Sequence, residues 1–243
     1  MVSKNQIKLI TSLVQKKYRK EHQLFIAEGT KVIQELLQSN FELEHLYITK
    51  PLFTDVSDSK KIMVSDSDLK KITALTTAND CLAVFRIPNE KQIENNGLIV
   101  ALDDIRDPGN LGTIIRLCDW FGITQIVCSE QTVDVYNPKV VQATMGSIGR
   151  VNISYIELET YLANTKKEVF GTFMDGENIY KTQLPTSGVI VLGNEANGIS
   201  KIIEEKVTQK IAIPRFGNLQ LTESLNVATA TAIVLSEFKR LER

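Results

Sequence analysis

Cysteine and histidine are scarce in this 243-residue sequence, which contains three cysteines and two histidines. Cys81, Cys118 and Cys128 are widely spaced and form no Cys-x-x-Cys pair, so the sequence favours a reducing cytosol over a disulfide-stabilised secreted protein. Neither His22 nor His45 has a second metal-binding side chain near it at the spacing of a metal site. We therefore expect no metal.

Long hydrophobic runs are also missing. The amino terminus mixes polar and apolar residues without the apolar centre of a signal peptide, and no segment approaches the length of a membrane span. The hydrophobic content of 43% over 243 residues is enough for one large core or two modest ones. These features predict a cytoplasmic protein with no membrane partner.

The overall charge is balanced, with 28 Lys and Arg residues against 29 Asp and Glu residues. This balance neither indicates nor excludes a nucleic-acid partner. The first 24 residues, however, contain only one carboxylate, Glu21, and six cations: Lys4, Lys8, Lys16, Lys17, Arg19 and Lys20. Such a segment can contact phosphates, although charge alone favours the simpler interpretation of a solvated helix face.

Residues 1–90 alternate between helical and strand patterns. We predict helices over residues 3–18, 29–37 and 66–72, and strands over residues 24–27, 46–48, 62–64 and 81–85. The polar segment 88–97, which contains Pro, Asn and Gly, is the best candidate for a linker. The pattern predicts a small α/β domain over residues 1–90.

After the linker, strand and helix patterns follow each other regularly. Strands are predicted over residues 98–102, 125–128, 151–156, 169–173, 189–192 and 211–213, and helices over residues 111–121, 138–147 and 224–241. Strands that are apolar on both faces are typical of a parallel sheet covered by helices. Residues 98–243 are therefore predicted to form a second α/β domain.

Three polar loops of this second part follow apolar, β-branched runs: residues 107–116 (DPGNLGTIIR), 192–195 (LGNE) and 221–226 (LTESLN). Ligands of α/β proteins bind where the carboxyl ends of parallel strands meet, so we expect the three loops to line one crevice. Taken singly, each loop has a simpler explanation, because Asn110 and Ser224 are both good helix caps.

Two residues of these loops carry more specific expectations. Gly193 has no Cβ and therefore lets a ligand approach the backbone. Arg116 is flanked by apolar residues on both sides, which predicts a mostly buried helix in which the guanidinium needs a partner. That partner is either Asp119 or a phosphate of the substrate.

The order and content of the three loops resemble the signature motifs of the SpoU (TrmH-type) RNA ribose 2′-O-methyltransferases, a branch of the SPOUT class. The residues that carry the resemblance are Asn110, Arg116, Asn194, Glu195, Ser224, Leu225 and Asn226. It extends over residues 98–243. Residues 137–147 resemble the family's connector except at Gln142, where relatives often have a basic residue. Residues 17–29 resemble part of the small RNA-binding domain that precedes the catalytic domain in many members.

The resemblance implies a SPOUT-type parallel sheet with a carboxy-terminal trefoil knot, preceded by a small α/β RNA-binding domain. It also implies a homodimer that binds S-adenosylmethionine in a bent form within the knotted loops. The cofactor contacts implied for this sequence are Leu192, Gly193, Asn194, Ile213, Leu221, Leu225 and Met145.

The reaction implied by the resemblance is attack of a ribose 2′-hydroxyl on the sulfonium methyl, without a metal. Its catalytic residues would be Asn110, Arg116, Glu195, Ser224 and Asn226. Because arginine stays protonated, Arg116 is better suited to clamping a phosphate than to acting as a base. RNA affinity would come from Lys16, Lys17, Arg19 and Lys20. Ribosomal RNA is the preferred substrate, and transfer RNA remains an alternative.

Two other interpretations are less well supported. A dinucleotide-binding Rossmann protein would need a Gly-x-Gly-x-x-Gly spacing, which residues 107–112 lack, and Glu130 is poorly placed to bind a ribose. A non-catalytic RNA-binding protein with a vestigial methyltransferase site would not need the polar residues of all three motifs, yet all of them are present.

Overall fold

The computed structural model describes residues 2–217 and 224–240, which divide into two units. The first unit contains the residues up to Glu90 together with Asp134–Arg150, and the second contains Lys91–Val133 and the residues from Val151 onward. The predicted division at residues 1–90 and 98–243 assigned Asp134–Arg150 to the second domain. In the structure this segment, which we call the connector, packs with the first unit.

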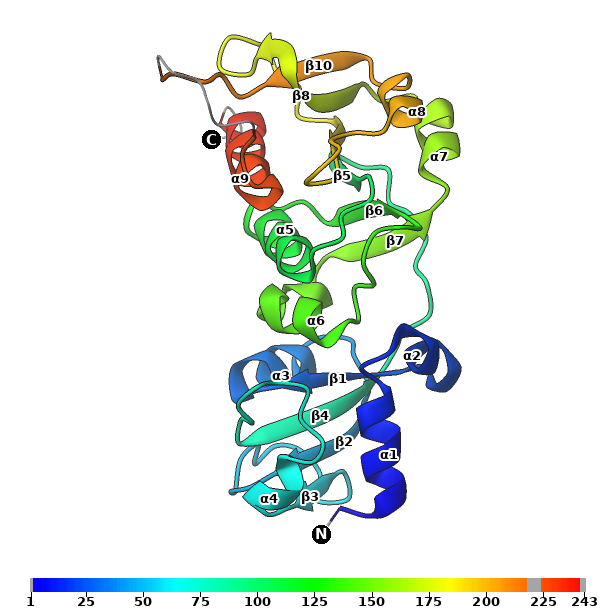
Figure 1. Cartoon of the computed structure of the whole chain (residues 1–243), viewed down its shortest axis with the longest axis vertical. Coiled ribbons are helices and arrows are strands. Elements are labelled where there is room, and N and C mark those ends of the chain that lie inside the picture. Colours follow the sequence, from blue (N-terminus) through cyan, green and yellow to red (C-terminus); the bar gives the residue numbers. More distant parts are fainter. Residues whose placement is uncertain (1, 218–223, 241–243) are drawn as a thin grey trace. The chain divides into compact units, whose positions relative to one another are not determined.

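The first unit is built on a four-stranded sheet in the order β1-β4-β2-β3 (Figure 1). Its strands are β1 (Leu24–Glu28), β2 (Leu43–Ile48), β3 (Lys61–Met63) and β4 (Cys81–Arg86), and its helices before the connector are α1 (Lys4–Ser12), α2 (Lys16–His22), α3 (Thr30–Leu37) and α4 (Asp66–Leu69). Strand β4 pairs antiparallel with both β1 and β2, and β3 pairs parallel with β2. The predicted α/β character of this part is confirmed.

The single helix predicted over residues 3–18 is two helices, because the chain turns between Ser12 and Lys16. The turn leaves the carbonyl groups of Leu13 and Val14 outside any helix. Arg19 supplies the missing donors, since its Nη1 lies 2.8 Å from each of these two carbonyl oxygens. A side chain of α2 thus stabilises the break that precedes its own helix.

Arg19 is also paired with the connector. Its side chain is 2% exposed, and Nε and Nη2 donate to Asp134 Oδ2 at 2.9 and 2.5 Å. The two carbonyl oxygens and this carboxylate accept four hydrogen bonds from the guanidinium, which has five N–H donors. The prediction that Arg19 binds RNA is therefore wrong, whereas Lys16, Lys17 and Lys20 of the same helix are exposed.

The connector contains α6 (Pro138–Thr144) and the short 3-10 helix η1 (Ser147–Gly149). Tyr136, just before α6, packs its ring against Phe25 of β1 with the centroids 4.9 Å apart, and Phe41 lies edge-on to the same tyrosine. An apolar sequence pattern within residues 1–90 alone does not reveal this aromatic cluster, since one of its rings comes from a segment that is distant in the chain.

The far end of the connector approaches α3 closely. Arg150 Nη1 lies 2.7 Å from Glu35 Oε2. Gly146 has a φ of +98°, and a Cβ built there would lie 2.3 Å from the Cβ of Glu35. Glycine is therefore required at position 146 both by the backbone conformation and by the contact with α3.

The second unit is a six-stranded sheet in the order β10-β8-β9-β5-β6-β7, with every neighbouring pair parallel. The strands are β5 (Leu98–Leu102), β6 (Gln125–Ser129), β7 (Asn152–Ile156), β8 (Val169–Asn178), β9 (Gly188–Leu192) and β10 (Gln209–Ala212); the helices are α5 (Pro108–Trp120), α7 (Leu158–Asn164), α8 (Lys201–Glu204) and α9 (Val227–Lys239). The predicted parallel sheet is confirmed. The largest differences from the predicted ends are that β8 continues beyond residue 173 and that α9 begins after Asn226. Helices α7 and α8 were not predicted.

The three cysteines are free thiols in the interior of the two units. Burial raises the pKa of the Cys118 and Cys128 thiols far above the ordinary range. Among the helices of the described residues, none combines the length and the apolar character that a membrane crossing requires.

The ion pair between Arg19 and Asp134 gives a test of connector docking. Asp134→Ala leaves the buried guanidinium without its carboxylate, so we expect a loss of about 3–5 kcal/mol in the free energy of unfolding. Arg86→Ala is the control, because Arg86 is half-exposed where it pairs with Glu44, and its loss should stay below about 1 kcal/mol. Urea unfolding of the full chain measures both. Equal losses in the two variants would contradict a structural role for the Arg19 pair.

Candidate active site

The polar loops of the second unit meet at the carboxyl edge of its sheet, as the strand pattern predicted. One loop joins β5 to α5, a second follows β9, and a third segment, residues 224–226, precedes α9. Neighbouring strands β5 and β9 run parallel, so their loops leave the same edge side by side. A direct chain of hydrogen bonds then joins one residue from each of the three segments.

This chain consists of Asn226, Asn110 and Glu195, which we call the polar triad. Asn226 Nδ2 donates to Asn110 Oδ1 at 2.9 Å, and Asn110 Nδ2 donates to Glu195 Oε1 at 2.9 Å. The first amide cannot be reversed, because Asn226 Oδ1 already accepts from the backbone N–H groups of Ala228 and Thr229. One helix cap therefore sets the orientation of both amides and directs a donor at the Glu195 carboxylate.

The start of α5 places Asn110 in this chain. Asp107 is the N-cap of the helix and accepts from the backbone N–H of Asn110 at 2.8 Å, and Pro108 occupies the first helical position. Proline suits that position because its fixed φ matches the helix and no N–H is lost there. Because Asp107 caps α5, the side chain of Asn110 does not cap the helix and can hydrogen-bond to Glu195 instead.

The cap of α9, like that of α5, is a different residue from the one that the sequence suggested. The helix was expected to begin at Ser224, but its N-cap is Asn226. Ser224 and Leu225 therefore precede the helix as exposed residues that face the pocket described below.

Asn194 holds the loop after β9 in place. Its buried side chain donates from Nδ2 to the carbonyl oxygen of Asp104 at 2.8 Å, and its Oδ1 accepts from the backbone N–H groups of Ala196 and Asn197. The amide thus links the loop after β9 to the loop after β5, and it brings Glu195 to the edge where Asn110 lies.

Gly193 has a structural reason that the sequence interpretation missed. A Cβ built at this position would lie 2.2 Å from the backbone of Gly198 and Ile199. The turn formed by residues 194–198 therefore requires glycine even when no ligand is near. The contact explains the glycine without a ligand. Gly193 also lines the pocket, so the expectation that a ligand approaches its backbone stays a prediction.

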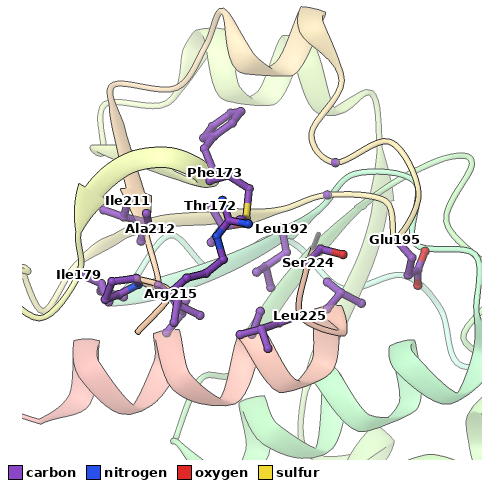
Figure 2. Close-up of a pocket in the computed structure, with 18 of the residues that line it drawn as sticks. Thr172, Phe173, Ile179, Leu192, Glu195, Ile211, Ala212, Arg215, Ser224 and Leu225 are labelled. Atoms are coloured by element: carbon purple, nitrogen blue, oxygen red, sulfur yellow. The ribbon is translucent and has the colours of Figure 1, made fainter. Parts of the chain in front are cut away.

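A pocket of about 1340 Å³ adjoins the polar triad (Figure 2). Its lining includes seven residues that the sequence analysis predicted: Leu192, Gly193, Asn194, Glu195, Ile213, Ser224 and Leu225. Leu221 lies outside the described residues. Met145 belongs to the first unit, as the left-handed residue that ends α6, so its predicted contact with the cofactor stays a prediction.

Other lining residues were not predicted. Thr172 and Phe173 of β8, Ile179 just after that strand, and Arg215 three residues after β10 also line the pocket. Figure 2 shows the Arg215 side chain extending into the same space as Leu192 and Leu225. The position of Arg215 just after a strand was a signal that could have identified it.

Arg116 is exposed, so the prediction of a buried guanidinium is wrong. Its apolar neighbours Ile114 and Ile115 point to the buried side of α5, whereas Arg116 shares the opposite side with Thr113 and Trp120. At 3.6 residues per turn, adjacent positions lie about 100° apart, so apolar neighbours do not imply burial. The catalytic role of Arg116 rests on the family resemblance and stays a prediction.

A model of the SpoU rRNA Methylase family matches residues 97–236, which include all three loops, the polar triad and the pocket. The chain belongs to this family. A model of the MRM3-like substrate binding domain matches residues 4–83, within the first unit. The family expected from the motifs is therefore confirmed.

The SpoU chain is similar to several proteins over nearly its whole length. It is 29% identical to the 23S rRNA (guanosine(2553)-2′-O)-methyltransferase RlmP of Bacillus subtilis (strain 168), over 96% of each chain. A Porphyromonas gingivalis structure assigned to the TrmH family of RNA methyltransferases is 38% identical and has a TM-score of 0.89, with 99% of each chain covered. An AdoMet-bound rRNA methyltransferase from Sinorhizobium meliloti is 27% identical, with a TM-score of 0.86 and coverage of 99% and 97%.

The polar triad can be tested by separating helix capping from amide orientation. Asn226→Asp keeps an oxygen for the α9 cap but removes the Nδ2 donor and adds a charge beside Asn110. We expect thermal stability to be unchanged or slightly higher, because acidic residues cap helices well, while methyl transfer falls about tenfold or more. Asn226→Ala, which removes both functions, should also lose about 1 kcal/mol of stability.

Methyl transfer and thermal unfolding are measured on both variants of Asn226. Full activity of Asn226→Asp would show that the residue acts only as a helix cap and that the orientation of Asn110 does not matter.

Proposed function

We propose that this protein transfers a methyl group from S-adenosylmethionine to a ribose 2′-hydroxyl of ribosomal RNA. The observation that carries the proposal is the meeting of the three family motifs at one edge of the sheet, where hydrogen bonds join Asn226, Asn110 and Glu195. The second and third motifs also line the adjoining pocket, whereas the first motif reaches it only through the bond from Asn110 to Glu195. The RlmP relative of Bacillus subtilis supports ribosomal RNA as the substrate. The similarity to the AdoMet-bound Sinorhizobium meliloti structure supports the cofactor.

The residues of the pocket fit this cofactor. Leu192, Ile213 and Leu225 give apolar surface for an adenine ring, and the Glu195 carboxylate supplies negative charge that suits a sulfonium. When bound, the cofactor supplies the methyl group in activated form. The pocket has room for a ligand of this size together with the nucleotide that it modifies.

Most of the rate acceleration would come from orientation and electrostatics, because the methyl group is already activated. Asn110 holds the Glu195 carboxylate in one position, where it can accept a hydrogen bond from an incoming hydroxyl. Ser224 adds a hydroxyl at the same side of the pocket. Arg116 is placed on the exposed side of α5, where a fully charged guanidinium can hold an RNA phosphate.

The knot and the dimer are also part of the proposal. A trefoil knot is supported by family membership and by the joint contribution of residues 192–198, 211–217 and 224–234 to one pocket. A homodimer is supported by Trp120, which is 84% exposed on α5 although indole side chains usually find a partner. The proposed place of action is the cytoplasm, which agrees with the three free thiols and with ribosomal RNA as substrate.

The first unit is proposed to supply RNA affinity through α2. Lys16, Lys17 and Lys20 are exposed on this helix, next to Tyr18 and His22, whose rings stack with their centroids 6.4 Å apart. A cationic helix with accessible aromatic rings suits phosphates and unstacked bases. The match of residues 4–83 to a substrate binding domain supports the same assignment.

The proposed activity predicts that the protein binds S-adenosylmethionine at one site per chain and methylates ribosomal RNA. Arg116→Ala should lower methyl transfer by a factor on the order of a hundred, because a contact made in the transition state is lost, while cofactor affinity stays the same. Arg116→Lys should recover only part of the activity, since an ammonium lacks the planar fork.

Calorimetry measures cofactor binding, and mapping of ribose methylation on ribosomal and transfer RNA measures the product. The absence of cofactor heat in folded protein would refute the proposed activity. Methylation confined to transfer RNA would refute only the substrate. An Arg116→Ala variant with full activity would remove Arg116 from the mechanism.

Charge variants, rather than removal of residues 1–90, give the better test of RNA affinity, because the connector packs against those residues. Replacement of Lys16, Lys17 and Lys20 by Gln should reduce the slope of log affinity against log salt by about 2, at about 0.7 for each lost phosphate contact with a single strand. Cofactor binding should not change. The matched control replaces Lys31, Lys70 and Lys71 by Gln, because these three lysines of the same unit are also exposed but lie outside α2. An unchanged salt slope in the α2 variant would show that the lysines of this helix face solvent and do not contact RNA.

A further inference from the structure

Arg106 is a cation in the loop after β5, at the same edge of the sheet as the polar triad. It lies between β5 and α5, directly before the N-cap Asp107, and its side chain is 70% exposed. Despite this exposure the guanidinium is held at two points, since Nε lies 2.9 Å from Asp104 Oδ1 and Nη2 lies 2.8 Å from Asp104 Oδ2. Such a two-point contact orients the planar group in a way that a single ion pair does not.

The carboxylate that holds Arg106 is itself anchored. Asp104 adopts a left-handed backbone conformation with a φ of +58°. Its backbone N–H donates to Ser129 Oγ at 2.9 Å, and its carbonyl oxygen accepts from Asn194 Nδ2 at 2.8 Å. The end of β6 and the loop after β9 therefore hold Asp104 from two sides. The usual flexibility of a surface arginine is reduced through this support.

The surroundings place Arg106 beside the polar triad. Asn110 lies four positions further along the chain, and the Glu195 carboxylate that it holds acts on the charge of Arg106. The Asp104 carboxylate first, and Glu195 after it, raise the pKa of Arg106, so the guanidinium keeps its charge under all ordinary conditions. A permanent cation thus stands at the edge where the proposed substrate ribose must enter.

The chemistry of the guanidinium points to a phosphate ligand. Of its five N–H donors, two are directed at Asp104, and the planar fork directs the remaining donors away from that carboxylate. A phosphate matches this second edge in charge and geometry. An arginine held by an aspartate in this way loses little side-chain entropy when it binds a phosphate.

We propose that Arg106 is a pre-oriented contact for a backbone phosphate of the RNA strand that is methylated. This inference rests on the proposed function, and it concerns a residue that none of the three motifs includes. Asp104 is then a positioning residue that acts through Arg106. The alternative is a surface ion pair with no function, of the kind that contributes little even to stability.

Three variants separate the two explanations. Arg106→Ala should lower kcat/KM for RNA about tenfold and reduce the salt slope of RNA binding by about 0.7–0.9, the value for one phosphate. Arg106→Lys should keep most of the salt slope but recover only part of kcat/KM, because the fork is lost. The affinity for S-adenosylmethionine should be unchanged in both.

The direction of the change in Asp104→Asn distinguishes an effect of charge from an effect of orientation. Asparagine tolerates the left-handed conformation, so the loop keeps its path, while the protein becomes more positive by one charge. If only charge matters, RNA binding becomes tighter. If orientation matters, kcat/KM for RNA falls although the positive charge has increased, and we expect this fall to be about threefold to tenfold.

Lys166→Ala is the matched control, because Lys166 is an exposed cation that precedes β8 and therefore lies at the opposite, amino edge of the parallel sheet. An Arg106→Ala variant that keeps the kcat/KM and salt slope of the Lys166→Ala protein would overturn the inference, as would tighter RNA binding with full activity in Asp104→Asn. These outcomes leave the proposed function intact when wild-type protein binds the cofactor and methylates RNA. A folded wild-type protein that does neither would overturn both.

Discussion

The helix cap at Asn226 is the interaction on which the candidate site depends. A helix start must satisfy free backbone N–H groups, and the Asn226 oxygen does so for α9. The same requirement leaves the Asn226 nitrogen facing Asn110, and through Asn110 it fixes a donor on Glu195. The orientation of the Glu195 carboxylate thus follows from the ordinary need to cap a helix.

The parallel sheet makes this arrangement possible. Strands β5 and β9 are neighbours, so the loops that follow them leave the same edge, and the buried amide of Asn194 ties the two loops together. The backbone contact at Gly193 tightens the second loop further. Asp104 is supported by Asn194 of the second loop and by Ser129 at the end of β6, which explains how an exposed arginine at position 106 can have a defined orientation.

In the first unit, the buried charge of Arg19 has a structural role. Arg19 satisfies two carbonyl groups at a helix break and pairs with Asp134 of the connector, so one side chain joins three segments of the chain. A buried ion pair of this kind contributes less to net stability than its short distances suggest, but removing one partner is costly. Its effect is to specify where the connector packs, together with Tyr136 and the close contact at Gly146.

The order of the strands, the parallel sheet, the family and part of the pocket lining could be predicted from the sequence, because each depends on local patterns and on motif residues that stand close together in the chain. The errors arose where a side chain's environment depends on distant segments. Arg116 has apolar neighbours yet is exposed, and Arg19 stands in a cationic run yet is buried. Local composition does not indicate which face of a helix is covered.

Sequence patterns alone were enough to identify the strands and the three motif loops, since periodicity and glycine or asparagine turns act over a few residues. Only the tertiary structure showed that Asp107 and Asn226 are the caps, that Asn110 is left to hold Glu195, and that the connector belongs to the first unit. The hold on Glu195 and the place of the connector depend on hydrogen bonds and ion pairs between residues that are 85 to 116 positions apart, and no local pattern contains them. The caps are local contacts, but neighbouring residues such as Asn110 and Ser224 offered equally good caps in the sequence.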